Sequence, residues 1–316
     1  MLTTQQLELF RTRGYLLVEG VLDPESDLDP VIAEYEILLD RLVRQLYDEE
    51  KISSLHEGLD FLSRLTEIYH ETGETFTQYF DISLPMTNVR PDTPFWTGPS
   101  IFKLIRNPAL VELVESVLGP EIASNPIQHT RIKPPSRLIG QDMQEGGLVG
   151  KTPWHQDAAV MPPDADTEFL TIWVPVNDAS KEAGCLQFLP DLVGGGLIPH
   201  GFGKVDGVEI PADTIEGVEP VAVPAKGGDI LLIHRYCPHA SLTNVSGQVR
   251  FSLDLRYHPS HQTSGREMFP SFIVRSKSDP GQELTDATAW TKMWEEARSW
   301  LATSPDAPRE TYPWLN

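Results

Sequence analysis

The chain is poor in cysteine, in positive charge and in long apolar runs. Its 316 residues hold two cysteines, Cys185 and Cys237, which are too few for a disulfide framework. No apolar run approaches the length of a membrane span, and the opening MLTTQQLELFRTRG lacks the basic start and apolar block of a signal peptide. These features predict a cytoplasmic protein that does not associate with membranes.

The charge balance argues against a polyanionic partner. Lysine and arginine number 25 against 46 aspartates and glutamates, which gives a formal net charge of −21. Nucleic acids and anionic membrane surfaces would be repelled unless a local basic patch existed, and the sequence shows none. We therefore expect no nucleic-acid partner, and a small molecule is the expected ligand. The sequence contains no indication of the oligomeric state.

The order of helical and strand-like segments predicts one domain over residues 1–316. Residues 1–120 are expected to be mostly helical, 121–260 to form the core, and 261–316 to form a C-terminal extension with a helix. The strand-like segments are PIQHTRIK, FLTIWVPV, GCLQFLP, EPVAVP, GDILLIHRY and VRFSLDLRY. Short strands flanked by helices favour a mainly β protein with an antiparallel core over a parallel doubly wound sheet.

The heptapeptide PWHQDAA, residues 153–159, places an imidazole and a carboxylate two residues apart. On a strand, His155 and Asp157 would point to one face while Gln156 points away. These ligand types suit Fe(II), Mn(II) or Zn(II). An H-x-D triplet also arises often by chance, so the segment is either a polar strand edge or two thirds of a metal site.

A third ligand and an anion site are available in residues 228–257. His239 follows a strand and a proline turn, and Arg250 comes eleven residues later with Ser252 on the same face. An arginine there could bind the far carboxylate of a diacid through a charge-assisted bidentate bond. His234 competes for the ligand role, but its alternation with apolar neighbours favours a core position.

This pattern of H-x-D, a distant histidine and R-x-S resembles the Fe(II)/2-oxoglutarate-dependent oxygenases. The blocks TIWVPVNDASKEAGCLQFLP and HASLTNVSGQVRFS, with LTTQQLELFRTRGYLLVEGVL, IKPP and PWHQD, are similar to the phytanoyl-CoA dioxygenase family. The resemblance covers most of the chain. It implies a double-stranded β-helix, the cupin-like jelly roll, with a metal at one mouth.

By position, the resemblance implies a role for each candidate site residue. His155, Asp157 and His239 would bind Fe(II), and 2-oxoglutarate and O2 would be cosubstrates. Residues implied for the cosubstrate pocket are Arg250, Ser252, Ser241, Trp173 and Lys133. His129 and Arg131 lie on the strand that the family uses near cosubstrate and substrate, and they are candidates for the substrate side. Their other interpretation is a solvated strand face.

The resemblance implies hydroxylation of an unactivated C–H bond in a small natural product or metabolic intermediate. Because Asp157 is present, no coordination position is vacated for chloride, so halogenation is disfavoured. The loop-rich stretches 140–152 and 191–217, with the aromatic-rich segment 269–275, are candidates for a substrate lid. Two alternatives stay open: a non-catalytic metal-binding jelly-roll protein, and a metal-dependent cupin-like enzyme that does not use 2-oxoglutarate. Arg250 with Ser252 speaks against the second.

The expected orientation of the strand VRFSLDLRY differs between the oxygenase interpretation and that of an ordinary half-buried strand. Its polar residues Arg250, Ser252, Asp254 and Arg256 alternate with the apolar residues Phe251, Leu253, Leu255 and Tyr257. In an ordinary half-buried strand the polar row faces solvent and the apolar row faces the core. In the oxygenase interpretation the polar row faces the mouth of the barrel, and the apolar row packs outward against helices.

Overall fold

The structure is a computed structural model that describes residues 1–140, 149–162, 165, 167–202 and 208–311. The two loop-rich candidate lid stretches therefore fall partly outside the described residues, since 141–148 and 203–207 are not among them. Within these ranges no helix combines the length and the apolarity needed to cross a membrane.

The strands form two main antiparallel sheets. The larger has the order β1-β8-β3-β10-β2-β11, with β1 (Tyr15–Val18), β8 (Ile230–His234), β3 (Leu170–Pro175), β10 (Arg250–Pro259), β2 (Glu121–Lys133) and β11 (Phe272–Ser276). The smaller sheet consists of β7 (Val221–Val223), β4 (Leu186–Phe188) and β9 (His239–Ser241). A short pair joins β5 (Gly201–Phe202) to β6 (Val208–Glu209).

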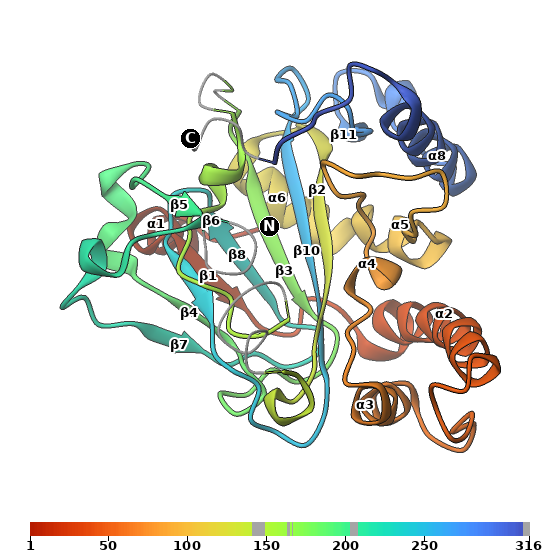
Figure 1. Cartoon of the computed structure of the whole chain (residues 1–316). Coiled ribbons are helices and arrows are strands. Elements are labelled where there is room, and N and C mark those ends of the chain that lie inside the picture. Colours follow the sequence, from red (N-terminus) through yellow and green to blue (C-terminus); the bar gives the residue numbers. More distant parts are fainter. Residues whose placement is uncertain (141–148, 163–164, 166, 203–207, 312–316) are drawn as a thin grey trace.

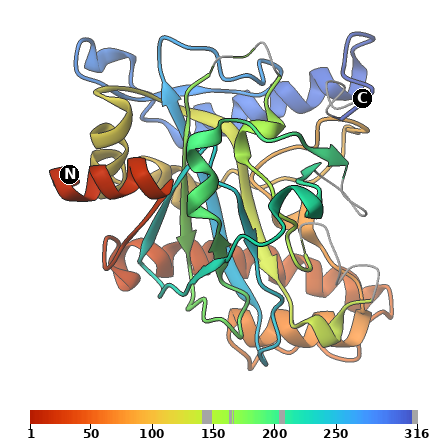
Figure 2. The same cartoon turned by 90° about the vertical axis from the view of Figure 1, so that its left-hand side faces the viewer.

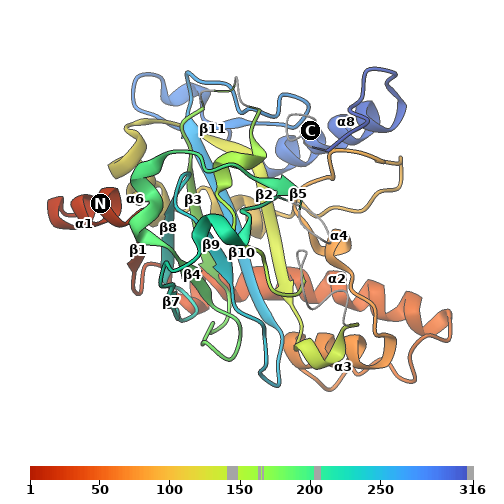
Figure 3. The ribbon, with the colours of Figure 1, turned by 60° about the vertical axis from the view of Figure 1, so that its left-hand side comes forward.

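The two main sheets face each other across an apolar layer. One buried cluster combines Trp173 and Leu231 of the larger sheet with Leu186 and Phe188 of the smaller one. Figure 3 shows β4, β7 and β9 grouped in front of β3 and β10. This arrangement is the cupin-like double-stranded β-helix that the sequence predicts.

Helices cover the outer face of the larger sheet. They are α1 (Thr4–Arg13), α2 (Asp29–Asp48), α3 (Phe61–Thr72), α4 (Thr77–Phe80), α5 (Pro99–Ile105), α6 (Pro108–Leu118) and α8 (Ala287–Thr303). In Figure 1, α2, α3, α5 and α8 lie on one side of β2 and β10, and β4 and β7 lie on the other. Figure 2 shows the long α2 crossing behind the strands. The site is therefore confined to the opposite face of the sheet.

The two faces of strand β10 have different surroundings. Phe251 packs its ring against Tyr35 of α2 and Phe61 of α3, with centroids 5.0 and 5.7 Å apart. The other apolar side chains of this face of β10 belong to the same buried cluster as Tyr35 and Phe61. On the opposite face, Arg250, Ser252 and Arg256 of the polar row are buried and Asp254 is half-buried. The orientation expected of an oxygenase core is confirmed.

Local residues set both ends of α1. The Thr3 hydroxyl accepts a hydrogen bond from the Gln6 N–H, and the Gln6 side chain caps Thr3 in return. Gly14 ends the helix with φ +74°, a left-handed conformation that favours glycine. The larger sheet also takes β1 and β11 from outside residues 121–260, so the strand core extends beyond that expected range.

Candidate metal and cosubstrate site

His155 and His239 come together through their backbones. Each donates its N–H to the carbonyl of the other, at 3.0 and 2.9 Å, and their ring centroids lie 4.3 Å apart. The strand expected around His155 is reduced to this single bridge, because a 3-10 helix, Asp157–Val160, begins two residues later. Gln156, which lies between His155 and Asp157, has an extended backbone with φ −111° and ψ 136°. The expected alternation therefore still places the side chains of His155 and Asp157 on one side.

Both imidazoles are fixed with one nitrogen free for a metal. Nδ1 of His155 lies 2.9 Å from the Pro153 carbonyl, and Nδ1 of His239 lies 3.0 Å from the Cys237 carbonyl. A carbonyl accepts only from a protonated Nδ1, which leaves the lone pair on Nε2. Burial, with His239 beside it, lowers the pKa of His155 to about 3, so this ring stays in the neutral form that binds metals.

Asp157 is buried and held by charge and by two donors. Arg256 Nη2 donates to Oδ1, and the Thr171 hydroxyl donates to Oδ2 at 2.6 Å. Burial alone would raise the pKa of Asp157, but the charge of Arg256, with the hydrogen bond from Thr171, holds it well below its usual value. Sequence reasoning missed both partners, although strand alternation had already placed Arg256 on the inner face.

The three side chains fit a divalent metal. One ligand atom from each of His155, Asp157 and His239 lies within 4.8 Å of the other two. Two neutral nitrogens and one carboxylate form the facial donor set that suits Fe(II). His234 ends β8 and instead packs against Phe10 and Tyr236, with ring centroids 6.0 and 5.6 Å away.

Arg250 and Ser252 have unused polar atoms in the interior. Among the described residues, neither Nε of Arg250 nor Oγ of Ser252 has a hydrogen-bond partner, and both residues are buried. The Arg250 guanidinium lies over the Trp173 ring, 5.4 Å from its centroid. Burial lowers the pKa of Arg250 to about 10. Unsatisfied buried donors are costly, and they fit an anionic ligand that accepts from both.

Lys133 and Ser241 lie beside this anion site. Lys133 Nζ donates to the Ser241 hydroxyl and, at 2.9 Å, to the Leu242 carbonyl. Strand register pairs Lys133 with Arg250 across β2 and β10. Burial, followed by the charges of Arg250 and Arg131, lowers the pKa of Lys133 well below its usual value. The structure therefore brings Arg250, Ser252, Trp173, Lys133 and Ser241 into one buried region.

His129 and Arg131 continue the same face of β2, and each has an acidic partner. His129 Nδ1 lies 2.9 Å from an Asp81 carboxylate oxygen, and Arg131 Nε donates to Asp254 at 2.9 Å. These side chains are 24% and 19% exposed. They are neither freely solvated nor part of the metal cluster.

Gln156 anchors the glycine-rich segment that follows β4. Its side chain donates to the carbonyls of Gly196 and Tyr236, at 2.8 and 2.7 Å, and accepts from the Ile198 N–H at 2.7 Å. Its own N–H donates to Nε2 of His200 at 3.0 Å. The residue between the two candidate ligands thus holds residues 196–200 against the site.

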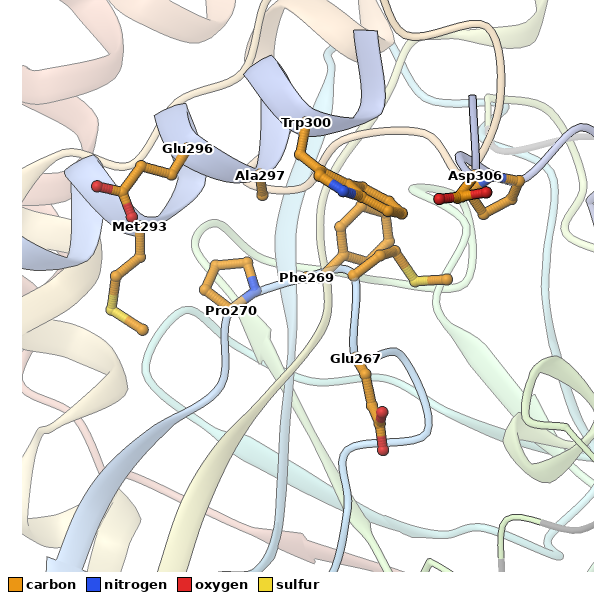
Figure 4. Close-up of a pocket in the computed structure, with 10 residues that line it drawn as sticks. Glu267, Phe269, Pro270, Met293, Glu296, Ala297, Trp300 and Asp306 are labelled. Carbon is orange, nitrogen blue, oxygen red and sulfur yellow. The ribbon is translucent and has the colours of Figure 1, made fainter. Parts of the chain in front are cut away.

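A separate cavity of about 670 Å³ lies between residues 267–270 and α8 (Figure 4). Met268, Phe269 and Trp300 contribute apolar walls, and Glu267 adds a carboxylate. The three candidate metal ligands do not line this cavity.

Two histidines and a carboxylate beside a buried arginine, inside a jelly roll, define the class of non-haem metal-dependent oxygenases. Residues 10–252 match the family model described as phytanoyl-CoA dioxygenase (PhyH). The chain belongs to this family, and it is an Fe(II)- and 2-oxoglutarate-dependent dioxygenase.

Individual relatives are distant. "Phytanoyl-CoA dioxygenase domain-containing protein 1" of Danio rerio is 23% identical over 262 residues, covering 79% of this chain and 88% of the relative. The solved structure of the apo non-heme monooxygenase ThoJ has a TM-score of 0.56 at 17% identity, covering 92% of this chain and 96% of that one. The epimerase SnoN, in complex with Fe3+, alpha ketoglutarate and nogalamycin RO, has a TM-score of 0.51 at 17% identity, covering 97% and 93%. These structures share the fold.

Proposed function

We propose that His155, Asp157 and His239 bind the iron, and that Arg250 with Ser252 binds the distal carboxylate of 2-oxoglutarate. We propose further that the enzyme hydroxylates an unactivated C–H bond of a small molecule. One observation carries this proposal: the convergence of three metal-type donor atoms within 4.8 Å. The unpartnered buried atoms of Arg250 and Ser252 support the cosubstrate assignment.

Each residue has a defined task in this proposal. The metal and the 2-oxo acid, when bound, supply the oxidising power by activating O2. His155 and His239 present fixed Nε2 lone pairs, and Asp157 supplies the negative ligand. Arg250 orients the diacid by a fork of donors, with Trp173 packed against its guanidinium. Because Asp157 is intact, hydroxylation is favoured over halogenation.

The remaining pocket residues are assigned by their place on the same inner face. Lys133 and Ser241, which are hydrogen-bonded to each other, would line the cosubstrate pocket beside Arg250. His129 and Arg131 are assigned to the substrate side, where their partial exposure leaves surface for a ligand. A natural product or metabolic intermediate is the proposed substrate class. The SnoN complex, in which a protein of the same fold holds nogalamycin RO, supports a natural product.

The proposal also includes a single domain over residues 1–316, a cytoplasmic location and no nucleic-acid partner. The free, buried state of Cys185 and Cys237 supports a reducing compartment. The net charge of −21 supports the absence of a nucleic-acid partner.

The test is succinate formation from 2-oxoglutarate with Fe(II), ascorbate and O2. The wild-type protein is expected to produce succinate slowly without substrate and faster with the correct one. Metal binding without any succinate would favour the non-catalytic jelly-roll protein. Substrate turnover that persists when 2-oxoglutarate is omitted would favour the cupin-like enzyme.

A further inference from the structure

Asp157 is part of a closed ring of hydrogen bonds. Arg256 donates through Nη2 to Oδ1 of the carboxylate, and Thr171 donates to Oδ2 at 2.6 Å. The ring closes because Arg256 also donates through Nε to the Thr171 hydroxyl at 3.1 Å. Strand register places Arg256 directly opposite Thr171 across β10 and β3, so the sheet itself fixes this geometry.

Arg256 cannot leave the ring easily. Its remaining nitrogen, Nη1, donates to the Ile127 carbonyl at 2.8 Å. Its side chain is 6% exposed, and that of Asp157 is 1% exposed. A buried ion pair gains little stability over apolar packing, because both charges must be desolvated. Stability alone therefore does not account for a guanidinium held against a candidate metal ligand.

The carboxylate oxygen that Arg256 contacts is the one nearest to another candidate ligand. Oδ1 of Asp157 lies 3.9 Å from Nε2 of His155. Both residues belong to the cluster that could hold a metal. A metal bound between these two atoms would therefore use an oxygen that already accepts a charged hydrogen bond from Arg256.

We propose that Arg256 is a positioning residue that substitutes for the metal's charge when the site is empty. It holds the Asp157 carboxylate in its ligand orientation, and it competes with the metal for the same oxygen. Two consequences follow. Arg256 stabilises the metal-free protein, and it weakens metal binding relative to the same site without the guanidinium. This inference rests on the proposed function, because it requires that the three ligands bind a metal.

The test compares Arg256→Met with the wild type by calorimetric Mn(II) titration and by melting temperature with and without Mn(II). In the metal-free variant, Asp157 has no counter-charge, so the melting temperature is expected to fall. Mn(II) then supplies the missing charge. The affinity for Mn(II) is expected to rise about 10-fold, opposite in direction to the loss that usually follows removal of a residue contacting a metal ligand, and the metal-induced rise in melting temperature is expected to grow. Equal or weaker Mn(II) binding by the variant would overturn the proposal.

Three further variants distinguish the reasons for which the Arg256→Met experiment could fail. Arg256→Gln keeps a donor without the charge, and it serves if Arg256→Met does not fold; its Mn(II) affinity must also exceed that of the wild type. The double variant Asp157→Asn with Arg256→Met removes both charges and is expected to recover metal-free stability while losing Mn(II) binding. Arg275→Met breaks the 2.9 Å pair with Glu115 and should leave Mn(II) affinity unchanged. If Mn(II) fails to bind the wild type, the proposed function itself is wrong, independently of Arg256.

Discussion

The main-chain carbonyl of Gly184 accepts a hydrogen bond of 3.0 Å from Nη1 of Arg250. Gly184 has φ +80°, and a Cβ atom there would lie 2.6 Å from the Leu242 carbonyl oxygen and 3.1 Å from Cδ of Lys133. The backbone that accepts this hydrogen bond and orients the guanidinium therefore requires glycine at position 184. The proposed cosubstrate site therefore depends on this turn as well as on its side chains.

Replacement of Gly184 by alanine should damage both stability and cosubstrate binding. The left-handed backbone costs about 1–2 kcal/mol, and the close contact adds about 1–3 kcal/mol. Gly217→Ala is the matched control, because Gly217 has φ +79° with nothing within 4 Å of the added atom. Denaturant unfolding should show the larger loss for Gly184→Ala. Only that variant should raise the KM for 2-oxoglutarate, and an equal KM in both variants would contradict the role of the turn.

Arg250→Met should weaken 2-oxoglutarate binding without unfolding the protein. A hydrogen bond to a charged group contributes about 1.5–3 kcal/mol, so the KM for 2-oxoglutarate should rise by about 10- to 150-fold. Methionine can pack beside Trp173 and leaves no buried charge. Succinate formation measured against 2-oxoglutarate concentration checks this. An unchanged KM would place the cosubstrate elsewhere.

His155→Ala and His239→Ala should each abolish stabilisation by Mn(II). A metal present at 100 times its Kd stabilises a folded protein by about 2.7 kcal/mol, which appears as a higher melting temperature. His234→Ala is the control, because its ring packs against Phe10 and lies outside the ligand cluster. That variant should melt at a lower temperature yet keep its metal-induced shift. Loss of the shift in all three variants would remove the support for this ligand set.

Gln156→Met should release residues 196–200 from the segment that carries the candidate ligands His155 and Asp157. The change leaves the Ile198 N–H and the Gly196 and Tyr236 carbonyls without their partner, at about 1 kcal/mol for each bond. Hydrogen exchange measured by NMR should become faster at the Ile198 amide. Gln262→Met, which removes the 2.7 Å bond to the Glu168 amide, is the control and should affect exchange at Glu168 instead. Unchanged protection at Ile198 would show that the segment is held by other contacts.

The candidate metal ligands could be picked out because they lie in short, recognisable motifs. His155 and Asp157 are two residues apart, and His239 precedes the R-x-S segment. The strand pattern also placed Arg250 on the inner face, where it lies. Strand alternation decides which side chains share a face, and the resemblance to the family selected the candidate ligands among them.

The partners that complete the site were not predictable in the same way. Arg256 meets Asp157 across 99 residues of sequence, and Gln156 meets Ile198 across 42. Such pairings depend on which distant segments the fold brings together, and a local sequence pattern does not specify this. Nothing in the local pattern indicated that a 3-10 helix begins at Asp157, directly after the single bridge between His155 and His239.

The pairing of β1 with β8 has a practical consequence for anyone shortening this protein. Residues Tyr15–Val18 cover one side of Ile230–Ile233, a strand whose side chains are almost fully buried. Removal of about the first twenty residues would expose the edge of β8, and an exposed apolar edge can pair with strands of other molecules. Such a truncated preparation should form aggregates even though every candidate metal ligand is still present.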